Sequence, residues 1–362
     1  MKESVNKTFN QFKIHTQYSI CEGAVKIDQL KDFCKKNKIK SLGLSDTYNL
    51  SGALEFSENL SSVGTQPIIG TQILFKFKEF KGLIPLIAKN YDGYKNIIKL
   101  SSKSYLENSE ITAPHCQIDD LVNNSDGIIV LTGSIRCLFG SLFNKGLFNE
   151  IEELLIKLKE KFEDNIYIEI QRHNDINEKN LEIYNLSLSK ELNIPIIASH
   201  EVYYLEKDLH DAHDALMCIG LKNYINDKNR FKLSNNHYFK NDEEMYKLFS
   251  DLPEALENNF NLPLRCSYRP VSSKPLLPNI GSESNFTADD ILRREAEKGL
   301  KDRFKNELTS QTKKTDSIVI VTASNSKFFD CLISLLKSCV SYKNSLIKFF
   351  INSFSDKYSS KI

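Results

Sequence analysis

The sequence lacks an excess of charge of either sign, because its 48 Lys and Arg residues nearly match its 47 Asp and Glu residues and leave a net charge of +1. A protein that clamps nucleic acid through its whole surface needs a strongly basic balance, so this class is excluded, although a local basic patch is not. No apolar run reaches the roughly 18 residues of a membrane-spanning helix. The first residues, MKESVNKTFNQF, lack the apolar stretch of a signal peptide. The sequence therefore predicts a cytoplasmic protein that does not associate with a membrane.

Paired cysteine motifs are absent as well, since no two cysteines are spaced as CxxC. The eight cysteines are Cys21, Cys34, Cys116, Cys137, Cys218, Cys266, Cys331 and Cys339. This scattered distribution is typical of free thiols in a reducing compartment, and it argues against both a disulfide framework and a zinc ribbon.

The sequence does contain enough apolar material for a folded core. Hydrophobic residues make up 41% and charged residues 26% of the chain, so wholesale disorder is not expected. A length of 362 residues is long for one ordinary domain and short for three. We therefore expect one large domain with an appendage.

Short apolar runs bounded by turn residues alternate with stretches of helical periodicity. The runs predicted as buried strands are Ile39–Leu44, Pro67–Ile69, Leu83–Ala88, Gly127–Leu131, Ile166–Ile170 and Pro195–Ala198. The residues predicted to line helix faces are Ile27, Leu30, Phe33 and Cys34, then Ile151, Leu154, Leu155, Leu158 and Phe162, then Leu181, Tyr184, Leu188 and Leu192. Buried strands separated by helices predict an α/β fold with a parallel sheet or barrel.

Polar side chains follow the ends of several of these strands. They are His15 and Glu22, Asp46, Gln72, the group Glu169, Gln171 and His173, and the pair His200 and Glu201. In a barrel the carboxyl ends of parallel strands meet on one face, where active sites lie. Imidazoles and carboxylates gathered there would suit a divalent metal ion. The alternative is that each residue is an ordinary loop group whose hydrogen bonds are satisfied within the protein.

Composition changes after residue 268. Residues 269–290 hold three prolines and several serines and are predicted to be a linker. Thr287 is placed as an N-cap with Asp290 three positions later, which starts a helix with Leu292, Ala296 and Leu300 on one face. In residues 305–362, the run SIVIVT at 317–322 is predicted to be a strand followed by an apolar helix that carries Phe328, Cys331, Leu332 and Leu335.

Several stretches together resemble one protein family. They are IHTQYSICEGA at 14–24, LSDTYNLSGALEFS at 44–57, QPIIGTQI at 66–73, YIEIQRH at 167–173, IASHEVYYL at 197–205, DAHDALMCIGLKNYINDKNR at 211–230 and HYFKNDEEMYKLFSDLPEALENN at 237–259. Over residues 9–300 the chain resembles the N-terminal polymerase-and-histidinol-phosphatase (PHP) domain of the bacterial DNA polymerase III alpha subunit, in its alphaproteobacterial variant. The resemblance implies a distorted, TIM-like (β/α) barrel over residues 1–268, the linker, the start of the family's helical region at 291–304, and a tail of unclear origin at 305–362.

The resemblance also implies which residues would bind metal. In metal-binding members a cluster of His, Asp and Glu residues holds two or three ions that hydrolyse phosphoesters. His15, Asp46 and His173 match that cluster, and Glu22 and Glu201 stand where the family usually has Asp. Four positions depart from the pattern, namely Lys13, Thr47, Gln72 and Tyr203. We therefore expect no catalytic residue in this chain and at most a weakly bound divalent ion (Zn, Mn or Mg). A lysine ammonium at position 13 would itself offset buried carboxylates and exclude a cation.

Two weaker motifs could be read as a metal site and as phosphate-binding loops. His210 and His213, in HDAHD, would lie about one helical turn apart and could bind metal, but the family places a helix here with His213 outside the metal cluster. Gly70 and Gly133 could belong to phosphate loops, yet neither has the full glycine spacing, so strand-end turns are favoured.

The family's polymerase motifs, which resemble GRGSGAGS and DFDxDF, do not occur in the chain. We therefore expect a chain truncated before the polymerase palm, and whether it is an enzyme stays open. The favoured function is a non-catalytic scaffold that binds the proofreading exonuclease subunit and other replicase subunits, with DNA bound only as part of a full-length polymerase. The alternatives are a metal-dependent phosphoesterase or 3′–5′ exonuclease, and a gene fragment without a role of its own.

Overall fold

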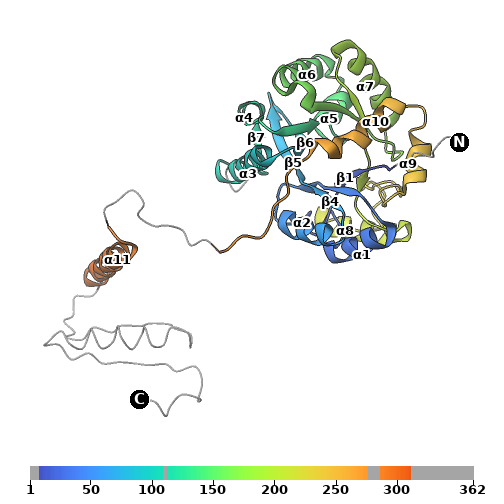
Figure 1. Ribbon diagram of the computed structural model, residues 1–362. Coiled ribbons are helices and arrows are strands. Elements are labelled where there is room, and N and C mark those ends of the chain that lie inside the picture. The colour runs from blue at the N-terminus through green and yellow to red at the C-terminus, as the bar shows by residue number, and fades with distance from the viewer. Residues whose placement is uncertain (1–7, 109–111, 276–285, 311–362) are drawn as a thin grey trace. The chain divides into compact units, whose positions relative to one another are not determined.

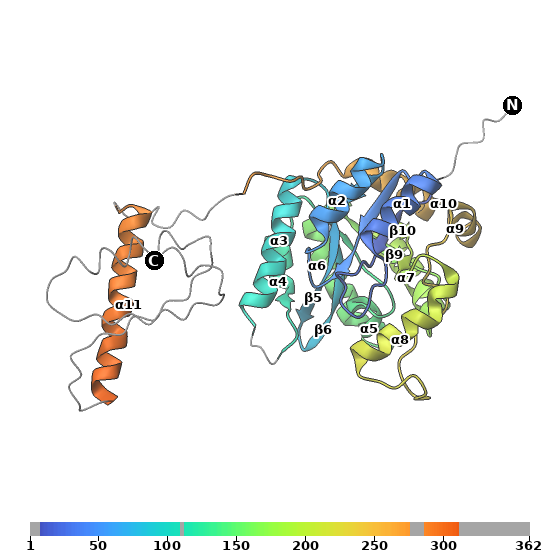
Figure 2. The same cartoon turned by 90° about the horizontal axis from the view of Figure 1, so that it is seen from below.

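The computed structural model of the protein describes residues 8–108, 112–275 and 286–310. The chain divides into two compact units, Met1–Lys274 and Pro275–Ile362. In the first unit the helices lie around the strands (Figure 1). Helices α3 and α7 lie on opposite sides of them in both views (Figure 2).

The strands are β1 (Gln11–Ile14), β2 (Ser41–Leu44), β3 (Asp46–Thr47), β4 (Gln66–Ile68), β5 (Gly70–Phe77), β6 (Phe80–Ala88), β7 (Cys116–Gln117), β8 (Ile128–Leu131), β9 (Ile166–Ile170), β10 (Ile196–Ala198) and β11 (Glu201–Val202). The α-helices of this unit are α1 (Ile27–Asn37), α2 (Ala53–Ser62), α3 (Tyr91–Leu106), α4 (Ile118–Asn123), α5 (Leu138–Asn144), α6 (Phe148–Phe162), α7 (Glu178–Leu192), α8 (His210–Leu221), α9 (Asp242–Leu248) and α10 (Pro253–Asn261). All six predicted strands are present, with bounds that differ by up to three residues.

The strands form two sheets. One has the order β11-β1-β2-β4, and its pairs are parallel. The other has the order β10-β9-β8-β6-β5-β3, with β7 beside β5. Among the described residues these two sheets do not join into a closed ring of hydrogen bonds, so the distorted TIM-like barrel is an open one.

The predicted α/β fold with parallel strands is present, but part of the second sheet is antiparallel. Strand β5 pairs with β6 in an antiparallel hairpin, and β6 pairs antiparallel with β8. Phe77 pairs with Phe80, so the hairpin loop is only Lys78 and Glu79. A two-residue loop can connect antiparallel strands directly, whereas parallel strands need a crossover of a dozen or more residues.

Helix faces and strand faces form the core as the periodicity predicts. On α6 the five residues at the predicted face are all buried. On β9 the outward side chains Ile166, Ile168 and Ile170 belong to the same cluster as α6, while Tyr167 joins a second cluster with residues of β1, β4, β6, β8 and β10. Glu169, of the same parity as Tyr167, lies near Lys13 in a polar cluster at the strand ends. Strand alternation therefore separates an apolar outer layer from an interior that is partly polar.

The start of the predicted linker lies against α2. The Ser57 hydroxyl donates to the carbonyl oxygen of Pro270 (2.6 Å), and the Ser272 amide donates to Glu58 (3.0 Å). In the second unit α11 runs over Ala288–Ser310, and Thr287 caps it by accepting from the Asp290 amide (3.2 Å), as predicted. Leu292 and Leu300, on its predicted apolar face, are exposed.

The strand predicted at 317–322 and the apolar helix predicted after it lie outside the described residues. The helices of the described ranges include none that is long and apolar enough to cross a membrane.

Candidate functional site

A dense polar cluster lies where β1 ends and where β3, β5 and β11 begin. His15 follows β1, Asp46 begins β3, Gln72 lies in β5 and Glu201 begins β11. The loop after β1 turns back tightly at Gly23, where a Cβ atom would lie 2.2 Å from the carbonyl oxygen of Thr16 and would clash. Only glycine fits there, which explains the glycine of the EGA sequence.

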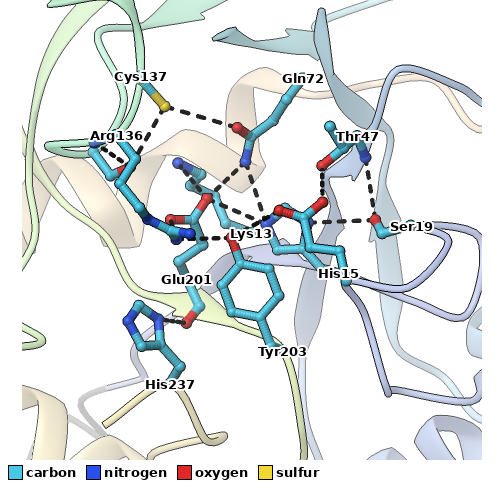
Figure 3. A network of polar contacts seen from close by, with 12 residues as sticks. Lys13, His15, Ser19, Thr47, Gln72, Arg136, Cys137, Glu201, Tyr203 and His237 are labelled. Atoms are coloured by element: carbon cyan, nitrogen blue, oxygen red, sulfur yellow. Dashed lines mark hydrogen bonds and ion pairs between the residues drawn. The ribbon is translucent and has the colours of Figure 1, made fainter. Parts of the chain in front are cut away.

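Glu201 is the centre of this cluster (Figure 3). One carboxylate oxygen, Oε1, accepts a hydrogen bond from the Gln72 amide (2.8 Å), and it lies 3.2 Å from both Lys13 Nζ and His15 Nε2. The other oxygen lies 3.1 Å from Arg136 Nη2. Burial alone would raise the pKa of Glu201, but Lys13, His15 and Arg136 outweigh it and hold the pKa well below its usual range. Glu201 is therefore a buried carboxylate already paired with two fixed cations.

Lys13 lies between two carboxylates. Its Nζ is 3.2 Å from Glu201 and 3.3 Å from Glu169, and its side chain is 1% exposed. Burial alone would lower the pKa of Lys13, yet Glu169 and Glu201 together raise it, so the ammonium stays charged. The Lys13 ammonium therefore lies where it offsets the charge of two buried carboxylates.

Arg136 was missed by the sequence analysis. It follows β8, donates to the Tyr203 hydroxyl (2.9 Å) and holds its guanidinium 5.4 Å from the centre of the Tyr203 ring and 5.8 Å from that of Phe231. Tyr203 in turn stacks on His15, with ring centres 4.3 Å apart. The signal that could have found Arg136 is its place after a predicted strand, the criterion that selected the other strand-end residues.

The remaining predicted carboxylates are satisfied by the protein itself. Asp46 accepts three hydrogen bonds of 2.7 Å, from the Thr16 amide, the Thr16 hydroxyl and the Ser19 hydroxyl. Glu22 accepts from the Thr47 hydroxyl (2.6 Å) and, at 3.5 Å, from Tyr203. Thr47 and Tyr203, at two of the positions that depart from the family's pattern, thus both donate to the Glu22 carboxylate.

His173 lies beside the main chain of Glu201 and not among the other predicted ligands. Its Nε2 accepts from the Glu201 amide (3.1 Å), and its Nδ1 lies 3.1 Å from Glu178. Burial, reinforced by His237 and His200, lowers the pKa of His173 well below its ordinary value. The structure thus joins His15 and Glu201 directly, links Glu22 and Asp46 to them through intervening side chains, and sets His173 apart.

The weaker motifs do not form ligand sites. His210 and His213 both lie on α8, but His210 contacts the Tyr204 hydroxyl (3.2 Å) and His213 contacts the carbonyl oxygen of Glu22 (2.8 Å). Gly70 is the first residue of β5, and Gly133 turns the chain after β8 with a φ of +85°.

The cluster does not fit a multinuclear metal centre. Both oxygens of Glu201 face cations, all the hydrogen bonds of Asp46 come from protein donors, and Lys13 and Arg136 place two positive charges among the carboxylates. A further metal ion there would be repelled and would find few free ligand atoms. Within the described ranges, one other set of side chains, His173, Asp175 and His237, has ligand atoms within 4.8 Å of one another.

Comparison with known proteins agrees with this architecture. The PHP domain family matches residues 11–173. The chain is 35% identical over 311 residues to the DNA polymerase III subunit alpha of Rickettsia conorii, covering 84% of this chain and 26% of that protein. It is 32% identical over 313 residues to the subunit of the same name from Caulobacter vibrioides, covering 84% of this chain and 27% of that protein.

A solved structure of an amidohydrolase from Chromobacterium violaceum matches at 9% identity and a TM-score of 0.36, covering 54% of this chain and 88% of the other, which is too low to carry an argument. The chain spans about a quarter of the length of the curated relatives it matches. It therefore contains a PHP domain and is a relative of the bacterial DNA polymerase III alpha subunits, corresponding to their PHP portion.

Proposed function

We propose that this PHP domain is a non-catalytic scaffold of the bacterial replicase and that it binds the proofreading exonuclease subunit. The observation that carries the proposal is the pairing of Glu201 with Lys13 and Arg136 at 3.2 and 3.1 Å. These side chains supply the positive charge that metal ions would supply in a hydrolytic member of the family.

The Lys13 ammonium and the Arg136 guanidinium cannot replace the metal ions of a hydrolytic site. Metal-dependent phosphoester hydrolysis needs ions that bind both water and substrate oxygens, lower the pKa of the bound water and stabilise the leaving group. An ammonium or guanidinium offers hydrogen bonds but no open coordination position. Lys13 and Arg136 can therefore hold the strand ends together, but they cannot generate the nucleophile.

The same ion pairs suit a binding role. A domain that presents a surface to a partner needs strands and loops fixed in position, and here buried pairs join β1, β9 and β11. A net charge of +1 argues against strong binding of duplex DNA by this chain alone, since such affinity grows with the number of phosphates neutralised. We therefore assign DNA contact to a full-length polymerase, and we place the protein, with other replicase subunits as further partners, in the cytoplasm.

The second candidate is a metal-dependent phosphoesterase or 3′–5′ exonuclease. It is favoured by one observation, namely that His15, Glu22, Asp46, His173 and Glu201 all keep residue types that bind metal. In that case Lys13 or Arg136 would have to leave Glu201 before an ion could bind.

The test is a pair of titrations of the full chain at physiological salt, one with the exonuclease subunit of the same organism and one with primed duplex DNA. The expected result is saturable binding of the exonuclease subunit and weak, salt-sensitive binding of DNA. No affinity for the exonuclease subunit, together with tight and salt-resistant binding of DNA, would refute the scaffold and favour the nuclease.

A further inference from the structure

The segment at the end of α1 concentrates positive charge. Residues 31–40 contain five lysines and one aspartate, a net charge of +4. Because the whole chain carries +1, all its other residues together carry −3. Four of the five lysines are exposed, and we call them the α1 lysine patch: Lys35, Lys36, Lys38 and Lys40.

The fold fixes the backbone of this patch. Helix α1 lies on the outside of the first unit (Figure 1), and its apolar face is buried. Past the end of the helix, the Thr65 hydroxyl donates to the carbonyl oxygen of Ile39 (2.8 Å), and the Gln66 amide donates to that of Lys40 (2.8 Å). The four ammonium groups therefore extend from a surface that is already ordered without a ligand.

The charges of the patch are not neutralised by the protein. Other lysines at the surface form ion pairs with carboxylates, namely Lys78, Lys95, Lys103, Lys157 and Lys232. Within the described ranges, no ion pair or hydrogen bond involves a side chain of the patch. The helix dipole favours basic residues in the last turn, which accounts for Lys35 and Lys36, but Lys38 and Lys40 lie beyond the helix. These charges are therefore free to meet an anionic ligand.

The patch is separate from the polar cluster around Glu201. Lys40 directly precedes β2, whereas His15 directly follows β1, and the two strands are parallel. Strand β2 has four residues and is therefore about 13 Å long. The patch and His15 thus lie at opposite ends of this sheet, and a ligand of the patch would not occupy the candidate metal site.

We propose that the α1 lysine patch binds the phosphate backbone of duplex nucleic acid, without regard to base sequence. A duplex carries one negative charge per about 1.7 Å of its axis, whereas an extended acidic peptide carries at most one per about 3.3–3.6 Å. A short segment with four lysines therefore meets the most charge on a duplex. Lysine is also a typical phosphate-backbone contact, and such contacts need no apolar or aromatic anchor.

The surroundings of the patch argue against two other anionic partners. Protein interfaces are enriched in aromatic residues and depleted in lysine, and binding to a membrane surface uses inserted apolar side chains. None of the large hydrophobic residues at positions 21–53 is exposed. The patch therefore offers charge alone, which suits a phosphate backbone.

The charge count sets the expected salt dependence. Each neutralised phosphate of a duplex contributes about −0.9 to the slope of log K against log salt concentration, so four lysines give a slope of about −3.6. Affinity should then rise about 50-fold between 150 and 50 mM salt. The inference rests on the weak, salt-sensitive DNA binding of the proposed function and places it at this patch, but it does not depend on the exonuclease subunit.

The experiment is fluorescence anisotropy of a labelled duplex of about 20 base pairs, titrated with the full chain between about 50 and 150 mM KCl. One variant carries Lys→Gln at all four positions of the patch, and a second carries Lys→Arg there. The matched control loses the same charge from four exposed lysines spread over the first unit: Lys99→Gln, Lys161→Gln, Lys190→Gln and Lys222→Gln.

We expect the patch Lys→Gln variant to bind at least about 30-fold more weakly at 50 mM salt and to lose about 1 unit of slope per lysine. The control and the Lys→Arg variant should bind within about threefold of the natural chain, since the first keeps the patch and the second keeps its charge. A single strand of the same length should bind more weakly than the duplex, since its slope per phosphate is about −0.7.

Four results would each overturn the proposal: no binding by the natural chain at 50 mM salt, equal losses in the patch and control variants, tighter binding of the single strand, or binding of polyglutamate or of phosphatidylserine vesicles as tight as that of the duplex. The patch Lys→Gln variant is also titrated with the exonuclease subunit, which it should bind as the natural chain does. Loss of that binding alone would make the patch a protein interface and would likewise overturn the proposal. Failure of the natural chain to bind the exonuclease subunit bears only on the scaffold, so the two proposals can fail separately.

Discussion

Replacing Lys13 with methionine removes the one cation that Glu169 contacts among the described residues. Methionine keeps most of the volume of the lysine stem, so the change removes charge rather than packing. Glu201 would still face Arg136 at 3.1 Å, whereas Glu169 would keep the Gln171 amide, which is uncharged. The substitution therefore leaves an uncompensated carboxylate whose side chain is 0% exposed.

The magnitude follows from the geometry. At the 3.3 Å that separates Lys13 Nζ from Glu169, two unit charges interact by about 5 kcal/mol at an effective dielectric constant of 20. Breaking a buried pair by removing one partner typically costs 3–5 kcal/mol. We therefore expect Lys13→Met to lower the free energy of unfolding by about 3–5 kcal/mol, a large fraction of the 5–15 kcal/mol that stabilises a typical domain.

Substitution of the other partner, Glu169, should lower the free energy of unfolding by less. Glu169→Gln leaves Lys13 paired with Glu201 at 3.2 Å, so no charge is stranded. The double variant Lys13→Met with Glu169→Gln removes both members of the pair and should recover at least about 2 kcal/mol of the loss caused by Lys13→Met alone, as buried pairs behave when they are replaced together.

The assay is urea-induced unfolding of the full chain, followed by circular dichroism at pH 7 and 25 °C, for the natural protein, the two single variants and the double variant. The reasoning is refuted if Lys13→Met unfolds within 1 kcal/mol of the natural chain, or if the double variant is no more stable than Lys13→Met. Either result would mean that the cluster takes its positive charge from elsewhere.

Three further predictions concern the site and the core. His173 and His200 have pKa values held well below 6.5 by burial, so the unfolded state binds their protons first and stability should fall below pH 6.5 by up to about 1.4 kcal/mol per pH unit for each, as pH-dependent melts would show. Stability that stays constant between pH 6.5 and 5 would contradict this. Gly23→Ala forces a Cβ atom against the Thr16 carbonyl, so its melting midpoint should drop by several degrees, and an unchanged midpoint would show that the loop can move. Every described core cluster draws on residues 9–266, so a fragment 1–304 should melt within a few degrees of the full chain, and a large drop would mean that the tail stabilises the barrel.

The sequence predicted the elements with strong periodicity and missed those without a local signal. Helix α6 has apolar residues at every expected position, and β9 carries isoleucine at every second position, so both were found. The β5–β6 hairpin was missed because its two-residue turn contains no glycine, and Lys78 instead takes a positive φ of 54°. Asn-Gly or Asp-Gly is the usual sign of such a turn.

The sequence predicted those residues of the site that lie near strand ends and missed those that the fold brings in from elsewhere. His15, which follows β1, and Glu201, which comes soon after β10, could be placed on one face because parallel strand ends converge. Arg136 follows a strand too, yet its role depends on a long side chain that reaches Glu201, 65 residues away in sequence. His237 comes from a segment between helices and meets Asp175 through the fold alone. Residue type and spacing cannot supply such contacts.

The most direct test of the account is hydrolysis by the full chain. The purified protein would be assayed on an activated phosphodiester and on single-stranded DNA with Mg²⁺, Mn²⁺ and Zn²⁺ in turn, alongside Glu201→Gln and Asp46→Asn. Because Lys13 and Arg136 pair with Glu201 where metal ions would bind, we predict no turnover above that of the two variants under any metal condition. Metal-dependent hydrolysis that disappears in Glu201→Gln would contradict the account and would show that the cluster is catalytic.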